Sequence, residues 1–264
     1  MERLSIITFM TTETLLLPVA MAAASGLVGC FAVMRRMALA GDALSHVALP
    51  GIGIAIALGI NPLLGAVTML FFGALLVWAL EGHAHVATET IVGVVFSVAL
   101  AIGSMMASGE ELIDALFGGA GVLSRAEVVF GVAGSCVVVA FILTQKNKLV
   151  VMLVSSEVAR TAGINVRLLD LLYLEMFSLT IALGLRYLGA LLMGALIIIP
   201  AATAKQVAKS LNGMLIVATV VALIATLAGT ALAAHIHRQT GPLIVTTAGA
   251  IFLLSLLYRR RRSA

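Results

Sequence analysis

Charged residues are scarce in this chain, making up only 11% of its 264 residues. A soluble domain is about a quarter charged and about half apolar, whereas 62% of this chain is apolar. That composition excludes a soluble globular protein and indicates an integral membrane protein. No polar stretch is long enough for a second domain, so we expect a single transmembrane domain over residues 1–264. The net charge of +4 then reports membrane topology and does not indicate nucleic-acid binding.

The sequence also lacks the motifs of two enzyme classes. It contains no Gly-x-x-x-x-Gly-Lys-Ser/Thr loop for nucleotide phosphates and no His-Glu-x-x-His zinc motif. We therefore expect that the chain is not an enzyme. Its two cysteines, Cys30 and Cys136, both lie in apolar runs, which favours two small buried side chains over a disulfide.

Long apolar runs dominate the rest of the sequence. A helix that crosses a bilayer needs about 20 residues, and polar or turn-forming breaks divide the chain into nine runs near that length. We predict an all-α polytopic membrane helix bundle with short discontinuous or kinked segments. Only Arg186 and Tyr187 separate the sixth and seventh runs, which form either a hairpin or one broken helix. The nine predicted spans are 14–34, 39–59, 62–80, 90–108, 127–145, 170–186, 188–204, 213–234 and 241–258.

Lysine and arginine are distributed unevenly between alternate connections. Twelve of the sixteen fall in one set and four in the other. The positive-inside rule then places the N-terminus outside and the C-terminus inside, which an odd number of spans also requires. The four arginines 259–262 are expected to anchor the C-terminus at anionic membrane lipid.

One apolar stretch carries two ionisable residues, Asp42 and His46. Four residues apart on a helix, they share a face. Ionisable groups at membrane depth indicate an ion or substrate route, and a carboxylate beside an imidazole suits a first-row divalent metal. Counting 1.5 Å per residue from Arg36 along a straight helix places Asp42 near the membrane edge. We predict that Asp42 and His46 are transient metal ligands; the alternatives are an acid paired with Arg35 or Arg36 and a histidine packed against a neighbouring helix.

Two prolines within predicted spans are candidates for a hinge or helix break. Pro50 cannot donate a hydrogen bond to the carbonyl of His46, which leaves that oxygen free beside the imidazole. Pro200 is expected to kink the seventh span, either as a gating hinge or as a static bend.

Two further histidine pairs lie at predicted span ends. His83 and His85, with acids nearby, form either a metal exit or sensing site or an ordinary polar loop. His235 and His237 form a docking site for a metal-binding protein, a first handover site for metal, or an interfacial turn. Within the sixth span, Glu175 is either a pathway acid or, as we expect, a partner of Arg167.

A cytoplasmic segment of about 146–168 contains a predicted short helix. Ser155 and Ser156 can cap its start, Glu157 places an acid in its first turn, and Ala159 continues it. Gly163 is a suitable C-terminal stop. The helix is either a solvated connector or a contact for a partner that works from the cytosol.

Several of these stretches resemble the signature of ABC-3 type permeases. They are Arg35-Arg36-Met37, Gly41-Asp42-Ala43-Leu44-Ser45-His46, Pro50-Gly51, Ser155 to Ile164, Ile197-Ile198-Ile199-Pro200-Ala201-Ala202-Thr203-Ala204 and Thr240-Gly241-Pro242-Leu243-Ile244-Val245. They occur in the family's order over nearly the whole chain. Glu157 departs from the family's coupling segment, in which an Asp-containing pattern is common.

The resemblance implies the membrane subunit of a bacterial zinc, manganese or iron importer in the cytoplasmic (inner) membrane. Its expected partners are a cytoplasmic ABC ATPase dimer, an extracytoplasmic metal-binding protein and a second copy of the chain. No permanently bound cofactor is expected, only the transported metal. The residues leave one alternative, a stand-alone proton-coupled metal transporter, which would need a proton relay through Asp42, His46 and Glu175.

Overall fold

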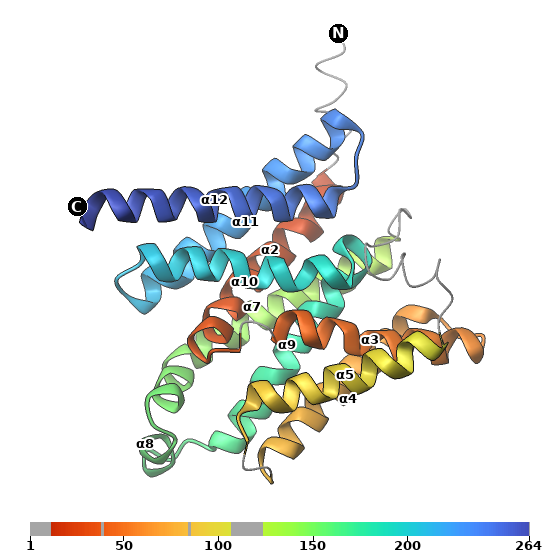
Figure 1. Ribbon diagram of the computed structural model, residues 1–264, viewed down its shortest axis with the longest axis horizontal. Coiled ribbons are helices and arrows are strands. Elements are labelled where there is room, and N and C mark those ends of the chain that lie inside the picture. The colour runs from red at the N-terminus through yellow and green to blue at the C-terminus, as the bar shows by residue number, and fades with distance from the viewer. Residues whose placement is uncertain (1–11, 38–39, 84–85, 107–123, 264) are drawn as a thin grey trace.

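Every regular element in the described part of the chain is an α-helix, which confirms the predicted fold class (Figure 1). The computed structural model describes residues 12–37, 40–83, 86–106 and 124–263. The helices are α2 (Thr12–Met34), α3 (Ala40–Ala57), α4 (Pro62–Glu81), α5 (Thr88–Met106), α7 (Arg125–Val154), α8 (Ser156–Thr161), α9 (Val166–Leu188), α10 (Ala190–Val207), α11 (Leu211–Ile236) and α12 (Thr240–Ser263).

Each of the nine predicted spans overlaps one of these helices. Within the described residues, eight helices are long and apolar enough to cross a membrane, while the apolar part of α10, Leu192–Val207, is shorter. The sixth and seventh spans form two helices, α9 and α10, that meet at Gly189. Gly189 has φ of +81°, a left-handed conformation that a glycine adopts without steric cost. The chain is therefore a multi-pass membrane protein.

Helix α7 is longer than its sequence predicts. It covers 30 residues, whereas the apolar run predicts a span of 127–145. A capping box with Ser124 and Glu127 starts it, and residues 146–154 contain no glycine or proline that would end it. The first part of the predicted cytoplasmic segment is therefore a continuation of α7.

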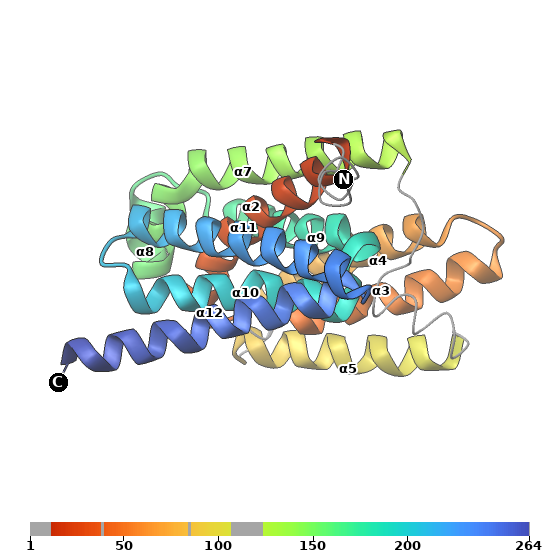
Figure 2. The same cartoon turned by 90° about the horizontal axis from the view of Figure 1, so that it is seen from above.

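The long helices run roughly along one axis, and the connections gather at its two ends (Figure 2). One end carries α8, the turn between α10 and α11, and the end of α12 (Figure 2). The opposite end carries the turn between α3 and α4 and the start of α7. The predicted cytoplasmic connections around α8 and after α10 therefore share one end; the assignment of that end to the cytoplasm stays a prediction.

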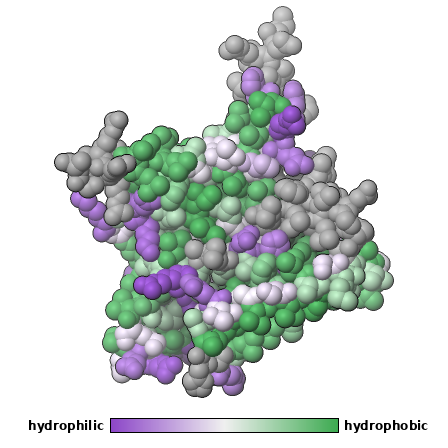
Figure 3. All heavy atoms as spheres, viewed as in Figure 1, coloured by the Kyte–Doolittle hydropathy of each residue, from purple (hydrophilic) through white to green (hydrophobic). Residues whose placement is uncertain are grey.

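Burial differs sharply between the helices. About two thirds or more of the apolar windows of α2 and α3 are buried (72% and 67%), against 22% in α7 and 17% in α12. The outer helices expose large apolar side chains such as Phe72, Phe130 and Leu254, as expected for surface that faces lipid (Figure 3). Cys30 is buried as predicted, but Cys136 is exposed on α7, and both are free thiols. Helix α3, which carries the predicted metal ligands, is thus largely buried in the bundle.

Candidate functional site

Asp42 and His46 face each other across one turn of α3, as their spacing predicts. Asp42 lies in the first turn of the helix, and its Oδ1 is 3.9 Å from Nε2 of His46. This distance is too long for a hydrogen bond. It is shorter than the sum of two metal–ligand bonds of about 2.1 Å each, so one ion can contact both atoms.

The two side chains differ in their exposure. His46 is 12% exposed, and its ring lies 5.3 Å from the ring of Phe96 on α5 (centroid to centroid). Its Nδ1 is buried and has no hydrogen-bond partner in the described part of the chain. Asp42 is 49% exposed. The imidazole is thus fixed against α5, whereas the carboxylate stays open on one side.

Glycines bring the neighbouring backbones against α3. A Cβ built on Gly194 of α10 would lie 2.8 Å from the backbone nitrogen of Asp42, and one on Gly51 would lie 2.1 Å from the carbonyl oxygen of Gly65 on α4. Real Cβ atoms do not approach backbone so closely, so only glycine permits these contacts. Close backbone approach at small residues is how helices associate within a membrane, where apolar burial gives little driving force.

The first turn of α3 does not lie at the end of the helix bundle. α7, α10 and α12 all extend past that turn toward the end with α8 (Figure 1). Helix α2 ends at Met34, where the backbone turns inward: Arg36 has φ of +61°, and the amide of Met37 donates to the carbonyl of Ala32 at 2.9 Å. Asp42 therefore lies within the bundle.

Neither candidate proline ends its helix. Pro50 lies inside α3 and Pro200 inside α10, and both helices continue past them. Pro50 is covered by α5, where a Cβ on Gly103 would lie 3.3 Å from its Cδ. A hinge role for either proline stays a prediction.

The other histidines do not assemble a metal site among the described residues. No three His, Cys, Asp or Glu side chains come together there. His83 is exposed just after α4, with Nδ1 2.8 Å from the carbonyl oxygen of Ala79, and His85 lies outside the described residues. His235 and His237 are exposed at the end of α11, where His237 caps the helix with φ of +51°.

The predicted pairing of Glu175 with Arg167 is not formed. Arg167 lies over the ring of Trp78 on α4, 4.8 Å from its centroid, and its carbonyl accepts a hydrogen bond from the Trp78 indole at 2.8 Å. Among the described residues, Oε2 of Glu175 is buried without a hydrogen-bond partner. The aromatic face of Trp78 holds the guanidinium instead, and this contact was not predictable because Trp78 and Arg167 are far apart in the chain.

The predicted cytoplasmic helix is present as α8. The Ser155 hydroxyl accepts a hydrogen bond from the amide of Val158 at 3.2 Å, and Gly163 ends the helix with φ of +75°. Ala159 is fully buried, which fixes α8 to the bundle, while Ser156 and Glu157 are exposed. The segment therefore presents exposed side chains at one end of the molecule while Ala159 packs against the bundle (Figure 2).

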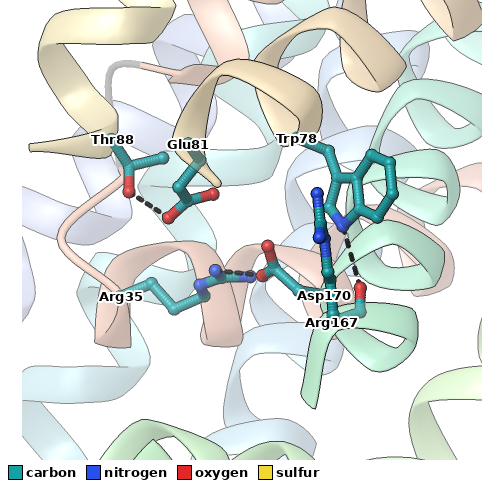
Figure 4. Close-up of polar contacts among 6 residues, drawn as sticks. All are labelled: Arg35, Trp78, Glu81, Thr88, Arg167 and Asp170. Atoms are coloured by element: carbon teal, nitrogen blue, oxygen red, sulfur yellow. Dashed lines mark hydrogen bonds and ion pairs between the residues drawn. The ribbon is translucent and has the colours of Figure 1, made fainter. Parts of the chain in front are cut away.

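Sequence reasoning missed several residues around these sites. Phe96 and Gly194 contact the metal-ligand pair, but one aromatic among ten phenylalanines and one glycine among 25 give no distinguishing signal. A polar cluster near α8 was also missed: Arg35 pairs with Asp170, and Glu81 accepts a hydrogen bond from Thr88 (Figure 4). These residues come from separate helices, so the sequence pattern alone does not bring them together.

Comparison with known proteins agrees with this architecture. The chain is 30% identical over 239 residues to the high-affinity zinc uptake system membrane protein ZnuB of Haemophilus influenzae, covering 88% of this chain and 91% of that protein. It is 29% identical to the manganese import system permease protein ScaB of Streptococcus gordonii, covering 88% and 84% of the two chains. The solved structure of PsaBC from Streptococcus pneumoniae in complex with Fab superposes with a TM-score of 0.81 at 25% identity, covering 95% and 94%. The profile of the ABC 3 transport family matches residues 7–259, and the chain therefore belongs to that family.

Proposed function

We propose that this chain is the permease subunit of an ATP-binding-cassette importer that moves a divalent transition metal into the cytoplasm. Zinc and manganese are the first candidates for that metal, and iron is the third. Membership of the ABC 3 transport family and the similarity to ZnuB and ScaB support the class of substrate. The chain itself carries no nucleotide-binding loop, so ATP is hydrolysed by a separate cytoplasmic ATPase dimer.

The observation that carries the proposal is the placement of Asp42 and His46. A carboxylate oxygen and an imidazole nitrogen stand 3.9 Å apart on a helix that is held inside the membrane bundle. This pair of donors matches the preferences of zinc, manganese and iron; magnesium and calcium prefer all-oxygen sites. His46 presents Nε2, and not its buried Nδ1, toward the carboxylate of Asp42.

The ligand count fits transport better than storage. Asp42 and His46 supply two ligands, and no third His, Cys, Asp or Glu joins them among the described residues. A tightly held zinc ion has four ligands. Two ligands per chain hold an ion only transiently unless a second copy of the chain, water or backbone oxygen completes the shell. Metal then passes from an extracytoplasmic binding protein to this pair and on to the cytosol.

Energy enters through the segment around α8. Its exposed face, with Ser156 and Glu157, is where the ATPase docks, and its buried Ala159 connects that contact to the bundle. Movement of α8 on ATP binding changes the side of the membrane to which the metal site opens. A mobile element with two positions is what such coupling requires.

The test is metal uptake into liposomes that contain the chain with its ATPase and binding protein. Zinc, manganese and iron are each supplied, with and without ATP, to complexes with the wild-type chain, Asp42→Ala and His46→Ala. We expect ATP-dependent uptake that falls at least about tenfold in both variants, because each removes half of the protein ligands and a tenfold loss corresponds to only about 1.4 kcal/mol. Thr246→Ala is the control, since Thr246 is exposed on α12 and its hydroxyl donates to the carbonyl of Pro242 in the same helix.

Two results would contradict the proposal. Uptake that a proton gradient drives without the ATPase would identify a secondary transporter, with Glu175 as the next residue to test. Uptake that survives both substitutions at matched protein levels would return Asp42 and His46 to structural roles.

A further inference from the structure

A cluster of charged and aromatic side chains joins four parts of the chain near α8 (Figure 4). Arg35 follows the end of α2, Glu81 ends α4, and Asp170 lies in the second turn of α9. Thr88 starts α5 and hydrogen-bonds Glu81. The cluster is separate from Asp42 and His46, and the proposed function does not yet use it.

Arg35 is held firmly on the Asp170 side. Its Nη2 forms an ion pair with Oδ1 of Asp170, and the two side chains are only 12% and 14% exposed. Its guanidinium also lies 5.1 Å from the ring centroid of Tyr173, whose hydroxyl donates to the carbonyl of Val28 at 3.2 Å. Because a buried charge is costly without a partner, this pair ties α9 to the end of α2.

The Glu81 side of the cluster is incomplete. Within the described part of the chain, Nη1 of Arg35 and Oε2 of Glu81 are both buried and both lack a hydrogen-bond partner. One is a donor and the other an acceptor. Figure 4 shows the Glu81 carboxyl and the Arg35 guanidinium in one cluster, in which the ion pair that forms joins Arg35 to Asp170. A rearrangement that brought Arg35 to Glu81 would satisfy both atoms.

Because Arg35 lies just before α3 in the chain, a change of its partner would act on the start of that helix. Arg36, the next residue, has a left-handed φ of +61°, which is unfavourable for a residue with a side chain. Met37 follows and accepts a hydrogen bond from the amide of Ala40, the first residue of α3, at 3.0 Å. On the other side of the ion pair, α9 follows α8 after only the residues 162–165. The pair therefore connects the segment around α8 to the start of the helix that carries Asp42.

We propose that Arg35 is a positioning residue that exchanges between Asp170 and Glu81 and so transmits movement of α8 to the metal-binding helix α3. In the state described here Arg35 pairs with Asp170. Displacement of α8 and α9 withdraws Asp170, and Arg35 then pairs with Glu81 on α4 and shifts the connection into α3. The inference rests on the proposed function, which assigns ATPase coupling to α8 and metal binding to α3.

The first test measures coupling in the complete complex in liposomes. Metal uptake and ATP hydrolysis are compared for wild type, Asp170→Asn and Glu81→Gln, and the number of ions imported per ATP is calculated. Lys146→Gln is the matched control, because Lys146 makes an exposed polar contact of 2.9 Å to Asn212 that joins α7 and α11 and does not reach α3. We expect the ratio to fall at least tenfold in Asp170→Asn and Glu81→Gln and to stay within twofold of wild type in the control. A parallel fall of uptake and hydrolysis, or an unchanged ratio, would show a static ion pair and overturn the proposal.

A second test is independent of metal transport. Spin labels are attached at Val86→Cys, before α5, and Glu157→Cys, on α8, both exposed positions, in the full chain with Cys30 and Cys136 replaced. The distance between the labels is measured in lipid nanodiscs without nucleotide. Asp170→Asn should populate a second distance, since Arg35 is released to Glu81, whereas Glu81→Gln should keep the single wild-type distance. Identical distributions in both variants would overturn the exchange. Failure of wild-type uptake with a positive result here would reject the proposed function and leave the exchange standing.

Discussion

At the scale of single residues, the position of Asp42 depends on a glycine in another helix. Gly194 of α10 lies against the backbone of Gly41 and Asp42, and no side chain fits between the two helices at that point. Any residue larger than glycine must push α10 away from α3 or displace the turn that carries the carboxylate. The geometry of the proposed metal site is therefore set partly from outside its own helix.

Replacing that glycine tests this dependence. In Gly194→Ala the new Cβ would lie 2.8 Å from the Asp42 nitrogen and 2.9 Å from its Cα, so one helix must shift. Overpacking of this kind costs about 1–3 kcal/mol. We expect a lower midpoint of thermal unfolding in detergent and an uptake about tenfold lower or worse, because a misplacement of about 1 Å suffices for such losses at a working site. Gly249→Ala on α12 is the control, since its Cβ would meet no described atom within 4 Å. Equal uptake by both variants would show that the α3–α10 contact does not position Asp42.

At the scale of elements, local signals in the sequence predict helices well and their ends less well. Apolar runs locate a helix for each of the nine predicted spans because a bilayer selects for length and apolarity, although among the described residues only eight of these helices are long and apolar enough to cross a membrane. The start and stop of α8 were predictable from Ser155 and Gly163, which act through local backbone geometry. The extension of α7 to Val154 was not, since polar residues at 145–148 end an apolar run without ending a helix.

The end of α8 provides a test of its proposed coupling role. Gly163 has φ of +75°, so Gly163→Val forces a β-branched residue into the left-handed region at a cost of about 1–2 kcal/mol. Gly59→Val is a matched control, because Gly59 has φ of +68° in open space at the opposite end of the bundle. We expect similar losses in the thermal midpoint of the two variants. Only Gly163→Val should lose metal-stimulated ATP hydrolysis in the reconstituted complex, and an equal loss in Gly59→Val would argue against α8 as the coupling element.

At the scale of the whole molecule, contacts between residues far apart in the chain determine pairings that the sequence alone does not predict. The pairing of Asp42 with His46 was predictable because four residues place both on one helical face. Arg35 and Asp170 are 135 residues apart, and the sequence offered Arg35 a nearer acid, Asp42. The fold settles that choice: α9 passes the end of α2, and Tyr173 supports the guanidinium from the same helix. Local patterns thus locate the site, whereas its connection to α8 emerges only from packing.

The number of metal ligands in one chain leads to a prediction about a complex that contains two copies of the chain. Asp42 and His46 provide two ligands, whereas a first-row metal ion prefers four or more. Asp42 is 49% exposed, so further ligands can reach the ion from its side, whereas His46 is only 12% exposed. A second copy that approaches Asp42 would complete the shell with its own pair, and one His46→Ala copy would then disable a shared site.

We expect complexes purified with one wild-type and one His46→Ala copy, distinguished by two affinity tags, to import metal about as slowly as complexes with two altered copies. Separate sites in each copy would instead leave about half of the wild-type uptake. A complex with one Thr246→Ala copy, prepared in the same way, controls for the tags and should keep the full rate, since Thr246 is exposed on α12 and bonds only within that helix.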